Sequence, residues 1–254
     1  MLNLRDQARQ HMPVVPNIPE LNEAAIGTWT ARMVNEYGSA RVFEGLHRQL
    51  SKCDLDSSDL ARLVSFAEDE RRHGVLCGAV VEALGGEAVA PPIPVVPFPE
   101  HPDVSDLEGA IRNLISISCM SETVAVALIG AERLEMPEGP LRELLTTIYA
   151  DECAHANFGW RLLGDLLERG GDVLKENLKP YVQLAFAHLE MHELAHLPIA
   201  AKPPKEGLQL GLCSGVDARA LFYATIKQVI IPGLTAHGLD AQWAWDTRSE
   251  ANLV

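Results

Sequence analysis

Apolar residues recur every three or four positions along most of the chain, and this spacing predicts amphipathic α-helices. The strict alternation of apolar and polar residues that is typical of half-buried strands is not a feature of the sequence. Glycine and proline residues collect at a few places and divide the helical pattern into segments. We therefore predict an all-α fold with helices over residues 20–50, 57–84, 105–135, 141–169, 172–197 and 216–231, the last broken at Pro232.

The stretches between these helices indicate how the chain is organised. Several prolines in the first residues predict an extended lead, and residues 90–102 are so rich in proline that we expect them to cross the surface as polyproline II. Gly170 and Gly171 end the fourth helix. We expect three parts, an extended N-terminal lead over 1–19, a helical bundle over 20–170, and a C-terminal helical extension over 171–254 packed on the bundle.

Composition narrows the class of protein. Apolar residues make up 47% of the 254 positions, which excludes intrinsic disorder and any need for disulfide cross-links. The formal charge of −14 disfavours a nucleic-acid partner, because phosphate binding needs clustered cations. The five cysteines are scattered and form no CxxC pair, and we recognise neither a signal peptide nor a membrane span, so we expect a cytoplasmic protein.

Charged side chains interrupt the apolar stripes of the four bundle helices. In the fourth helix, Glu152 and His155 take positions where core residues are expected. Each of the other three stripes carries one glutamate near its middle, Glu36, Glu70 or Glu122. A buried ionised carboxylate without a partner costs several kcal/mol, so four glutamates that face one another require cations between them.

The distances of these glutamates from the turns indicate whether they can meet. At about 1.5 Å per residue, Glu36 and Glu70 lie about 21 and 18 Å from the turn that joins their helices. Glu122 and Glu152 lie about 20 and 18 Å from theirs. Glu44, the other candidate ligand in the first helix, lies only about 9 Å from its turn and off the apolar stripe. We therefore predict that the other four glutamates form one layer.

A motif with histidine accompanies two of the four glutamates. The pattern Glu-x-x-His occurs four times, whereas chance predicts roughly one match. In two cases an aspartate directly precedes the glutamate, and chance predicts about 0.04 motifs of this kind. A nearby aspartate can hold the second ring nitrogen of a histidine that binds a metal. The two motifs are Asp69-Glu70-x-x-His73 and Asp151-Glu152-x-x-His155.

At these positions the chain resembles the ferritin-like diiron-carboxylate superfamily, in which two helices each supply a glutamate and two others each supply Glu-x-x-His. The resemblance covers about residues 20–170 and implies a four-helix bundle with a long crossover between the second and third helices, followed here by two or three extra C-terminal helices. It also implies that Asp69 orients His155 and that Asp151 orients His73. The metal ligands that it implies are Glu36, Glu70, His73, Glu122, Glu152 and His155.

The resemblance implies that the protein is an O2-dependent oxidoreductase. Two iron ions, or manganese ions or one of each, are the expected cofactor, and four carboxylates balance their four positive charges. The expected reaction oxidises or oxygenates a small organic substrate, with O2 and an external electron donor as partners and no nucleic acid or membrane. The C-terminal extension could shape a substrate pocket or a homodimer interface. The catalytic candidates are Glu36, Glu70, Glu122 and Glu152.

Other functions share parts of this pattern. A ferroxidase or iron-binding protein of the ferritin or rubrerythrin type uses the same ligands, and so does a transfer-RNA hydroxylase, which the acidic composition disfavours. The string His192-Glu193-x-x-His196 matches the HExxH signature of zinc proteases. Because no convincing third ligand follows it, we favour an accessory metal or hydrogen-bonding role over a protease.

Several residues near the motifs have a structural interpretation as well as a chemical one. Cys77 and Tyr149 could tune oxidant chemistry, but buried packing is favoured for both. Glu44 and His47 are expected to be structural. The arginines inside the first motif, Arg71 and Arg72, are expected on the outer face of their helix, where they could also pair with the abundant acids.

Overall fold

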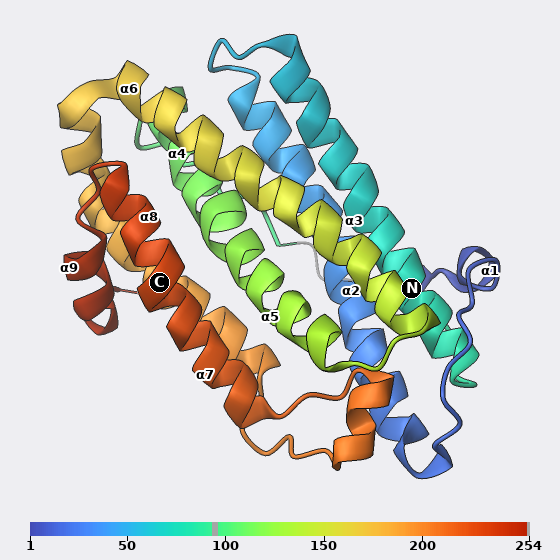
Figure 1. Ribbon diagram of the computed structural model, residues 1–254. Helices are drawn as coiled ribbons and strands as arrows, with labels where there is room; N and C mark the ends of the chain where they lie inside the picture. The colour runs from blue at the N-terminus through green and yellow to red at the C-terminus, as the bar shows by residue number, and fades with distance from the viewer. Residues whose placement is uncertain (93–95, 253–254) are drawn as a thin grey trace.

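The computed structural model describes residues 1–92 and 96–252, and it confirms the all-α prediction. Four long helical segments lie side by side (Figure 1). In Figure 1 the first and the fourth run upward, whereas the second and third run downward. They are α2 (Pro19–Leu50), α3 (Ser57–Ala83), the continuous segment of α4 (Asp106–Leu114), η1 (Ile115–Ser121) and α5 (Glu122–Glu135), and the first part of α6 (Pro140–His196).

The sequence predicts one uniform helix for the third segment, but the structure has a π-helical turn within it. Seven of its residues, Ile115–Ser121, form the π-helical turn η1 directly before Glu122. A π-turn inserts an extra residue into the helix and rotates the side chains that follow it. The N-terminus of the segment is capped by Ser105, whose side chain accepts a hydrogen bond from the Glu108 amide at 3.2 Å.

Helix α6 contains the fourth and fifth predicted helices, which meet at Gly171. This glycine has φ 68° and ψ −172°, outside the helical region, and α6 reverses its direction there (Figure 1). The predicted break at the Gly170–Gly171 pair is therefore confirmed. A residue with a Cβ is disfavoured at this φ, which explains the glycine.

The N-terminal lead is only partly extended, so the prediction for residues 1–19 is wrong in detail. Strand β1 (Leu2–Asn3) pairs with β2 (Val89–Ala90) in antiparallel fashion, and α1 (Arg5–Ala8) follows it. The carboxylate of Glu82 holds this region because it accepts hydrogen bonds from Arg9 Nε at 2.8 Å and from the Ala88 amide at 2.7 Å. The proline-rich stretch expected as polyproline II includes residues 93–95, which lie outside the described residues.

The C-terminal extension contains more helix than predicted. The sixth predicted helix does not break at Pro232, because the π-turn η3 (Ile226–Ile230) precedes it and places the proline in the first turn of α8, where a missing N–H is tolerated. Six residues of α9 are too few for a periodic signal, and this helix was not predicted. The elements are η2 (Lys205–Leu210), α7 (Gly215–Thr225), η3, α8 (Ile231–Ala236), α9 (Ala241–Asp246) and η4 (Arg248–Glu250).

The extension packs on the long helices through a shared hydrophobic core. Phe186, Phe222 and Trp245 belong to the same buried cluster as Phe43 and Phe158 of the long helices. Figure 1 shows α7 beside the second part of α6, where Tyr223 of α7 donates a hydrogen bond to Glu190 at 3.0 Å, and α9 also packs against α6. Burial of aromatic side chains is a dominant contribution to such packing, so the extension is held firmly.

Among the described residues, one helical segment, Asp106–Glu135, is long and apolar enough to cross a membrane by length and composition alone. It packs against the first part of α6, and 44% of its most apolar window is buried.

Candidate metal centre

Four helical segments bring the six predicted ligands to one place. Glu36 comes from α2, and Glu122 is the first residue of α5, directly after the π-turn. The two Glu-x-x-His motifs lie on α3 and α6, where the spacing of three residues puts both side chains on one face of the helix. All six side chains are buried or nearly so, and both imidazoles are fully buried.

The ligand atoms fall into two groups that share two glutamates. Within each group one atom from every residue lies within 4.8 Å of the others. Glu70 and Glu152 belong to both groups, so their carboxylates lie between the two sets of ligands. The first group is Glu36, Glu70, His73 and Glu152, and the second is Glu70, Glu122, Glu152 and His155.

Both imidazoles turn one ring nitrogen toward the carboxylates. His73 Nδ1 lies 3.2 Å from Glu152 Oε1, and His155 Nδ1 lies 3.2 Å from Glu70 Oε1. Yet both Nδ1 atoms are buried without a hydrogen-bond partner among the described residues. Buried polar atoms in this condition are rare in proteins and need an explanation. Carboxylate oxygens together with imidazole nitrogens suit divalent transition metals, so the residues present fit a metal site.

The other nitrogen of each imidazole is held by the aspartate of the opposite motif. His73 Nε2–H donates to Asp151 Oδ2 at 3.0 Å, and His155 Nε2–H donates to Asp69 Oδ2 at 3.5 Å. These are the pairings that the resemblance implied. They fix each ring so that Nδ1 points at the carboxylates, as outer partners of metal-binding histidines do.

Arg72 joins the two aspartates, which is the pairing with acids that the sequence left open for it. Its Nη2 lies 2.6 Å from Asp151 Oδ2 and 2.9 Å from Asp69 Oδ1, although its side chain is half exposed. The neighbouring Arg71 pairs instead with Glu44 and Glu68. Arg72 is therefore a positioning residue for both aspartates. Nothing in the motif distinguishes Arg72 from its neighbour Arg71, so this role could not be predicted from sequence.

We expect Arg72→Gln to weaken divalent metal binding by about threefold to tenfold, somewhat less than the loss of a direct partner of a ligand histidine. The physical reason is that both aspartates lose the charge that holds them against the imidazoles. Calorimetric titration of metal-free protein checks this expectation. Arg71→Gln is the matched control and should leave the affinity unchanged, so an equal loss in both variants contradicts the assignment.

A close approach of two helices supports the centre. A Cβ on Gly74, the residue after His73, would lie 2.7 Å from Tyr37 Cβ and 3.0 Å from the Tyr37 amide nitrogen. No side chain fits there without a shift of α2, so the glycine allows α2 to bring Glu36 to His73.

Neighbouring aromatic rings shield the other imidazole, since the His155 ring centroid lies 4.4 Å from that of Phe66 and 5.0 Å from that of Phe43.

The carboxylates and imidazoles compete for protons in this dry surrounding. Burial raises the pKa of Glu70 to about 8, and burial with the nearby Glu152 carboxylate raises the pKa of Glu122 well above its usual range. Burial lowers the pKa of His73, but Asp151, Glu152 and Glu36 outweigh it and raise the pKa to about 12. Burial also acts to raise the pKa of Glu152, but its contacts with Glu122 and both imidazoles keep it below its usual value.

Metal binding must displace these protons, and its affinity should therefore depend on pH. Glu70, with a pKa of about 8, and His73, with a pKa of about 12, hold protons at neutral pH, and a metal ion binds only their deprotonated forms. We expect the apparent affinity to fall by at least about tenfold for each unit of acidification between pH 8 and pH 6, since at least one proton is displaced. Titrations in buffers of different ionisation enthalpy would measure the proton release. An affinity that is independent of pH over this range contradicts the expectation.

A large cavity opens beside the centre. Its volume is about 1860 Å³, and its lining is mainly apolar. Most of the lining comes from α2, α5 and the segment between α6 and α7, with further residues from α3, α6 and α7. All four glutamates of the centre line it, so the centre is accessible from the cavity. Small-molecule pockets commonly measure about 300–1000 Å³, so this one has room for an organic substrate. The C-terminal extension thus lines a pocket, which is one of the two roles expected for it.

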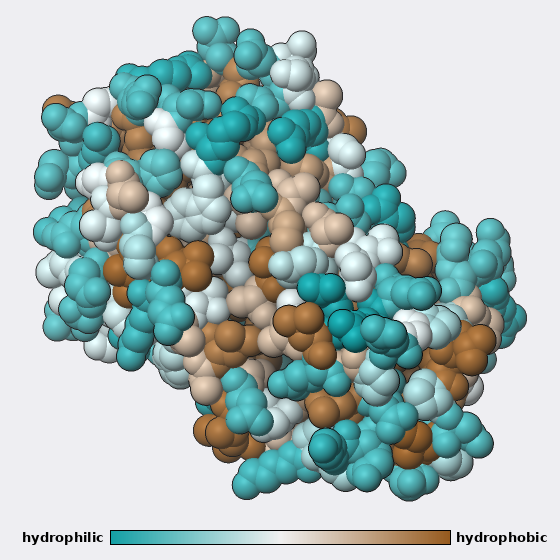
Figure 2. Space-filling view, viewed as in Figure 1, coloured by the Kyte–Doolittle hydropathy of each residue, from teal (hydrophilic) through white to brown (hydrophobic). Residues whose placement is uncertain are grey.

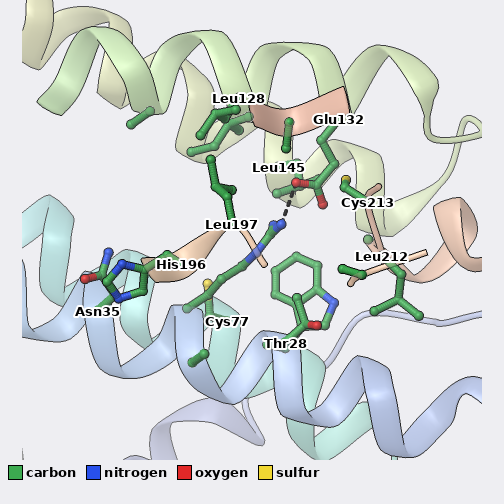
Figure 3. A pocket seen from close by; sticks show the side chains of 18 of the residues that line it. Thr28, Asn35, Cys77, Leu128, Glu132, Leu145, His196, Leu197, Leu212 and Cys213 are labelled. Carbon is green, nitrogen blue, oxygen red and sulfur yellow. Dashed lines mark hydrogen bonds and ion pairs between the residues drawn. The ribbon is translucent and has the colours of Figure 1, made fainter. Parts of the chain in front are cut away.

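Away from the glutamate layer the cavity contains a partly buried ion pair that sequence reasoning missed. Arg32 Nη2 lies 2.6 Å from Glu132 Oε2, and Figure 3 shows this contact as a dashed line. The Arg32 guanidinium also lies 4.8 Å above the Trp29 ring, whose Nε1–H donates to the Leu210 carbonyl at 2.8 Å. Arg32 lies one turn before Glu36 on α2, and this spacing was the one signal available in the sequence.

The remaining candidates from the sequence lie in different surroundings. Cys77 is fully buried and lines the cavity, and burial raises the pKa of its thiol well above the usual range. Tyr149 lies under the Arg133 guanidinium at 4.5 Å and does not line the cavity. No third histidine, cysteine or carboxylate ligand joins His192 and His196 among the described residues, which leaves the zinc protease interpretation without support.

Comparison with models of known protein families and with curated protein sequences gives no match for the chain. The functional assignment therefore depends on the geometry described above.

Proposed function

We propose that the protein is a nonheme diiron oxidoreductase that uses O2 to oxidise or oxygenate a small organic substrate. The observation that carries this proposal is the pair of ligand groups that share Glu70 and Glu152. A pair of ligand sets with common carboxylates would hold two metal ions, with Glu70 and Glu152 within reach of both. Iron is the metal proposed, although manganese or a mixed pair uses the same donors.

Within this proposal each residue has a separate task. Glu36 and His73 would complete the ligands of one ion, and Glu122 and His155 those of the other. Asp151 and Asp69 hold the Nε2 protons of the two imidazoles and keep Nδ1 directed at the ions. A bound pair of ferrous ions supplies the electrons and open coordination positions that reduction of O2 requires.

The arrangement of the long helices also supports a ferritin-like bundle. The two helical hairpins, α2 with α3 and α5 with α6, pack internally, and the chain from Leu84 to Ser105 connects them. Because α3 and the α4–α5 segment run in the same direction in Figure 1, this connection must return along the bundle. A connection of this kind is the long crossover of ferritin-like folds.

The cavity favours an organic substrate over a ferroxidase function. In a ferroxidase the ferrous ion itself is the substrate, which needs no mainly apolar space of about 1860 Å³ beside the centre. The Arg32–Glu132 pair adds a polar feature to this space that could orient a substrate. A separate electron donor is needed for repeated turnover and is part of the proposal.

Aerobic addition of excess Fe(II) tests the proposal. We expect uptake to stop near two ions per chain, one for each ligand group, and the protein to keep its size in gel filtration. Oxidation of many ferrous ions per chain, with iron retained in a large assembly, would instead show an iron-storage protein. Protein that binds fewer than two ions per chain would contradict a diiron centre of either kind.

A further inference from the structure

The two histidines at the end of α6 are not used by the proposed function, although they border the same cavity. His192, Glu193 and His196 line the cavity together with the four glutamates of the centre. Figure 3 shows His196 at the cavity wall, where Asn35 and Leu197 are also labelled. A metal ion bound to these histidines would be within reach of molecules in the cavity. A histidine pair elsewhere on the surface would not have this access.

The two imidazoles lie close to each other. They are four residues apart on one helix, and their ring centroids are 4.6 Å apart with an interplanar angle of 45°. Positions four residues apart share one face of a helix, so one ion can reach both rings. His188 is also four residues from His192, but it does not line the cavity and no ring contact joins it to His192 among the described residues.

Each imidazole is held through Nδ1. His192 Nδ1–H donates to Glu193 Oε1 at 3.2 Å, and His196 Nδ1–H donates to the His192 carbonyl at 2.9 Å. This leaves the Nε2 lone pair of each ring available for a ligand. Histidines that bind metals are held in the same way, with the second ring nitrogen bonded to a carboxylate or a backbone carbonyl.

The end of the helix that carries the two histidines is held in place by an arginine. Arg219 of α7 donates from Nε to the Leu197 carbonyl at 2.5 Å and from Nη2 to the Leu194 carbonyl at 2.9 Å, which fixes the last turn of α6.

We propose that His192 and His196 form a third metal site, which binds one divalent transition-metal cation through the two Nε2 atoms at the cavity wall. Two protein ligands leave further coordination positions to water or to a molecule in the cavity. Imidazole nitrogen suits nickel, copper and zinc, so this site should prefer those ions more strongly than the carboxylate-rich centre does. The inference does not depend on the proposed function, because the two sites have no ligand in common.

Nickel binding to a variant without the central ligands tests the proposal. In the Glu70→Ala, Glu152→Ala double variant, whose helical content is first checked by circular dichroism, we expect calorimetry to detect one Ni²⁺ per chain. Adding His192→Gln or His196→Gln should lower the Ni²⁺ affinity by at least about tenfold. Adding His188→Gln is the matched control and should change it by less than about threefold.

Three results would overturn the assignment. The double variant could bind no Ni²⁺, its affinity could be unchanged by His192→Gln and His196→Gln, or His188→Gln could lower it as much as they do. Because the central glutamates are already replaced in this background, none of these results bears on the diiron proposal. Conversely, loss of iron binding at the centre would leave the outcome for His192 and His196 unchanged.

Discussion

Replacing Glu70 or Glu152 with alanine is expected to remove two-ion binding and O2-dependent activity together. Each carboxylate belongs to both ligand groups, so each substitution takes a ligand from both ions at once. Loss of an outer partner alone lowers metal affinity by about 10–100-fold, so loss of a shared ligand should lower it by more than about 100-fold. Iron analysis after anaerobic loading and gel filtration measures the effect.

Glu44→Ala is the matched control for these two variants. Glu44 also begins a Glu-x-x-His sequence, but it lies on the outside of α2 and pairs with Arg71. We expect this variant to bind two ions like the unaltered protein. If Glu70→Ala and Glu152→Ala both kept two ions per chain, the shared carboxylates would not be ligands and the assignment would be wrong.

Removal of the metal is expected to cause a large loss of thermal stability. An ion present at about 100 times its dissociation constant stabilises the folded state by about 2.7 kcal/mol, so two ions contribute about 5 kcal/mol. For a chain of this size each kcal/mol shifts Tm by about 2–4 °C. We expect metal-free protein to unfold roughly 10–20 °C below the loaded form in differential scanning calorimetry.

The Glu70→Leu variant distinguishes stabilisation of the fold by bound metal from stabilisation by packing of the side chain at position 70. Burial raises the pKa of Glu70 to about 8, so its carboxyl group destabilises the metal-free fold increasingly as pH rises from its unfolded value toward 8. Glu70→Leu should therefore make the metal-free protein more stable at neutral pH, by about 1–4 kcal/mol, while metal no longer raises its Tm. Metal stabilising this variant as much as the unaltered protein would contradict the expectation.

The location of the centre could be predicted from sequence because helical spacing is regular. Glu36, Glu70, Glu122 and Glu152 occupy core stripes at similar distances from their turns, and the structure brings them together. Helix rise is nearly constant, so counting residues sufficed even though the third segment contains a π-turn. The family resemblance implied that Asp69 and Asp151 hold the imidazoles of the opposite motifs, and the structure has these contacts.

Features that depend on tertiary contacts could not be predicted in this way. Arg72 joins Asp69 and Asp151, which come from two different helices, and the sequence alone does not distinguish it from Arg71. The partner of Arg32 lies 100 positions away at Glu132. The continuation of the last long helix through Pro232 depends on a π-turn, which has no clear sequence signal.

The surface over the cavity shows the same dependence on tertiary structure. Figure 2 shows brown, hydrophobic patches among polar ones on the face formed by α5, α7 and the segment between α6 and α7. Exposed apolar residues of these segments include Leu134 at 64%, Ile199 at 57% and Val216 at 48%. They come from three separate segments, so no single stretch of sequence identifies this face.

Anomalous diffraction at the iron edge, from crystals of protein loaded anaerobically with Fe(II), tests the central claim most directly. We predict two iron peaks, each next to one of His73 and His155, with Glu70 and Glu152 in contact with both. A single peak, or two peaks that do not share these carboxylates, would contradict the account.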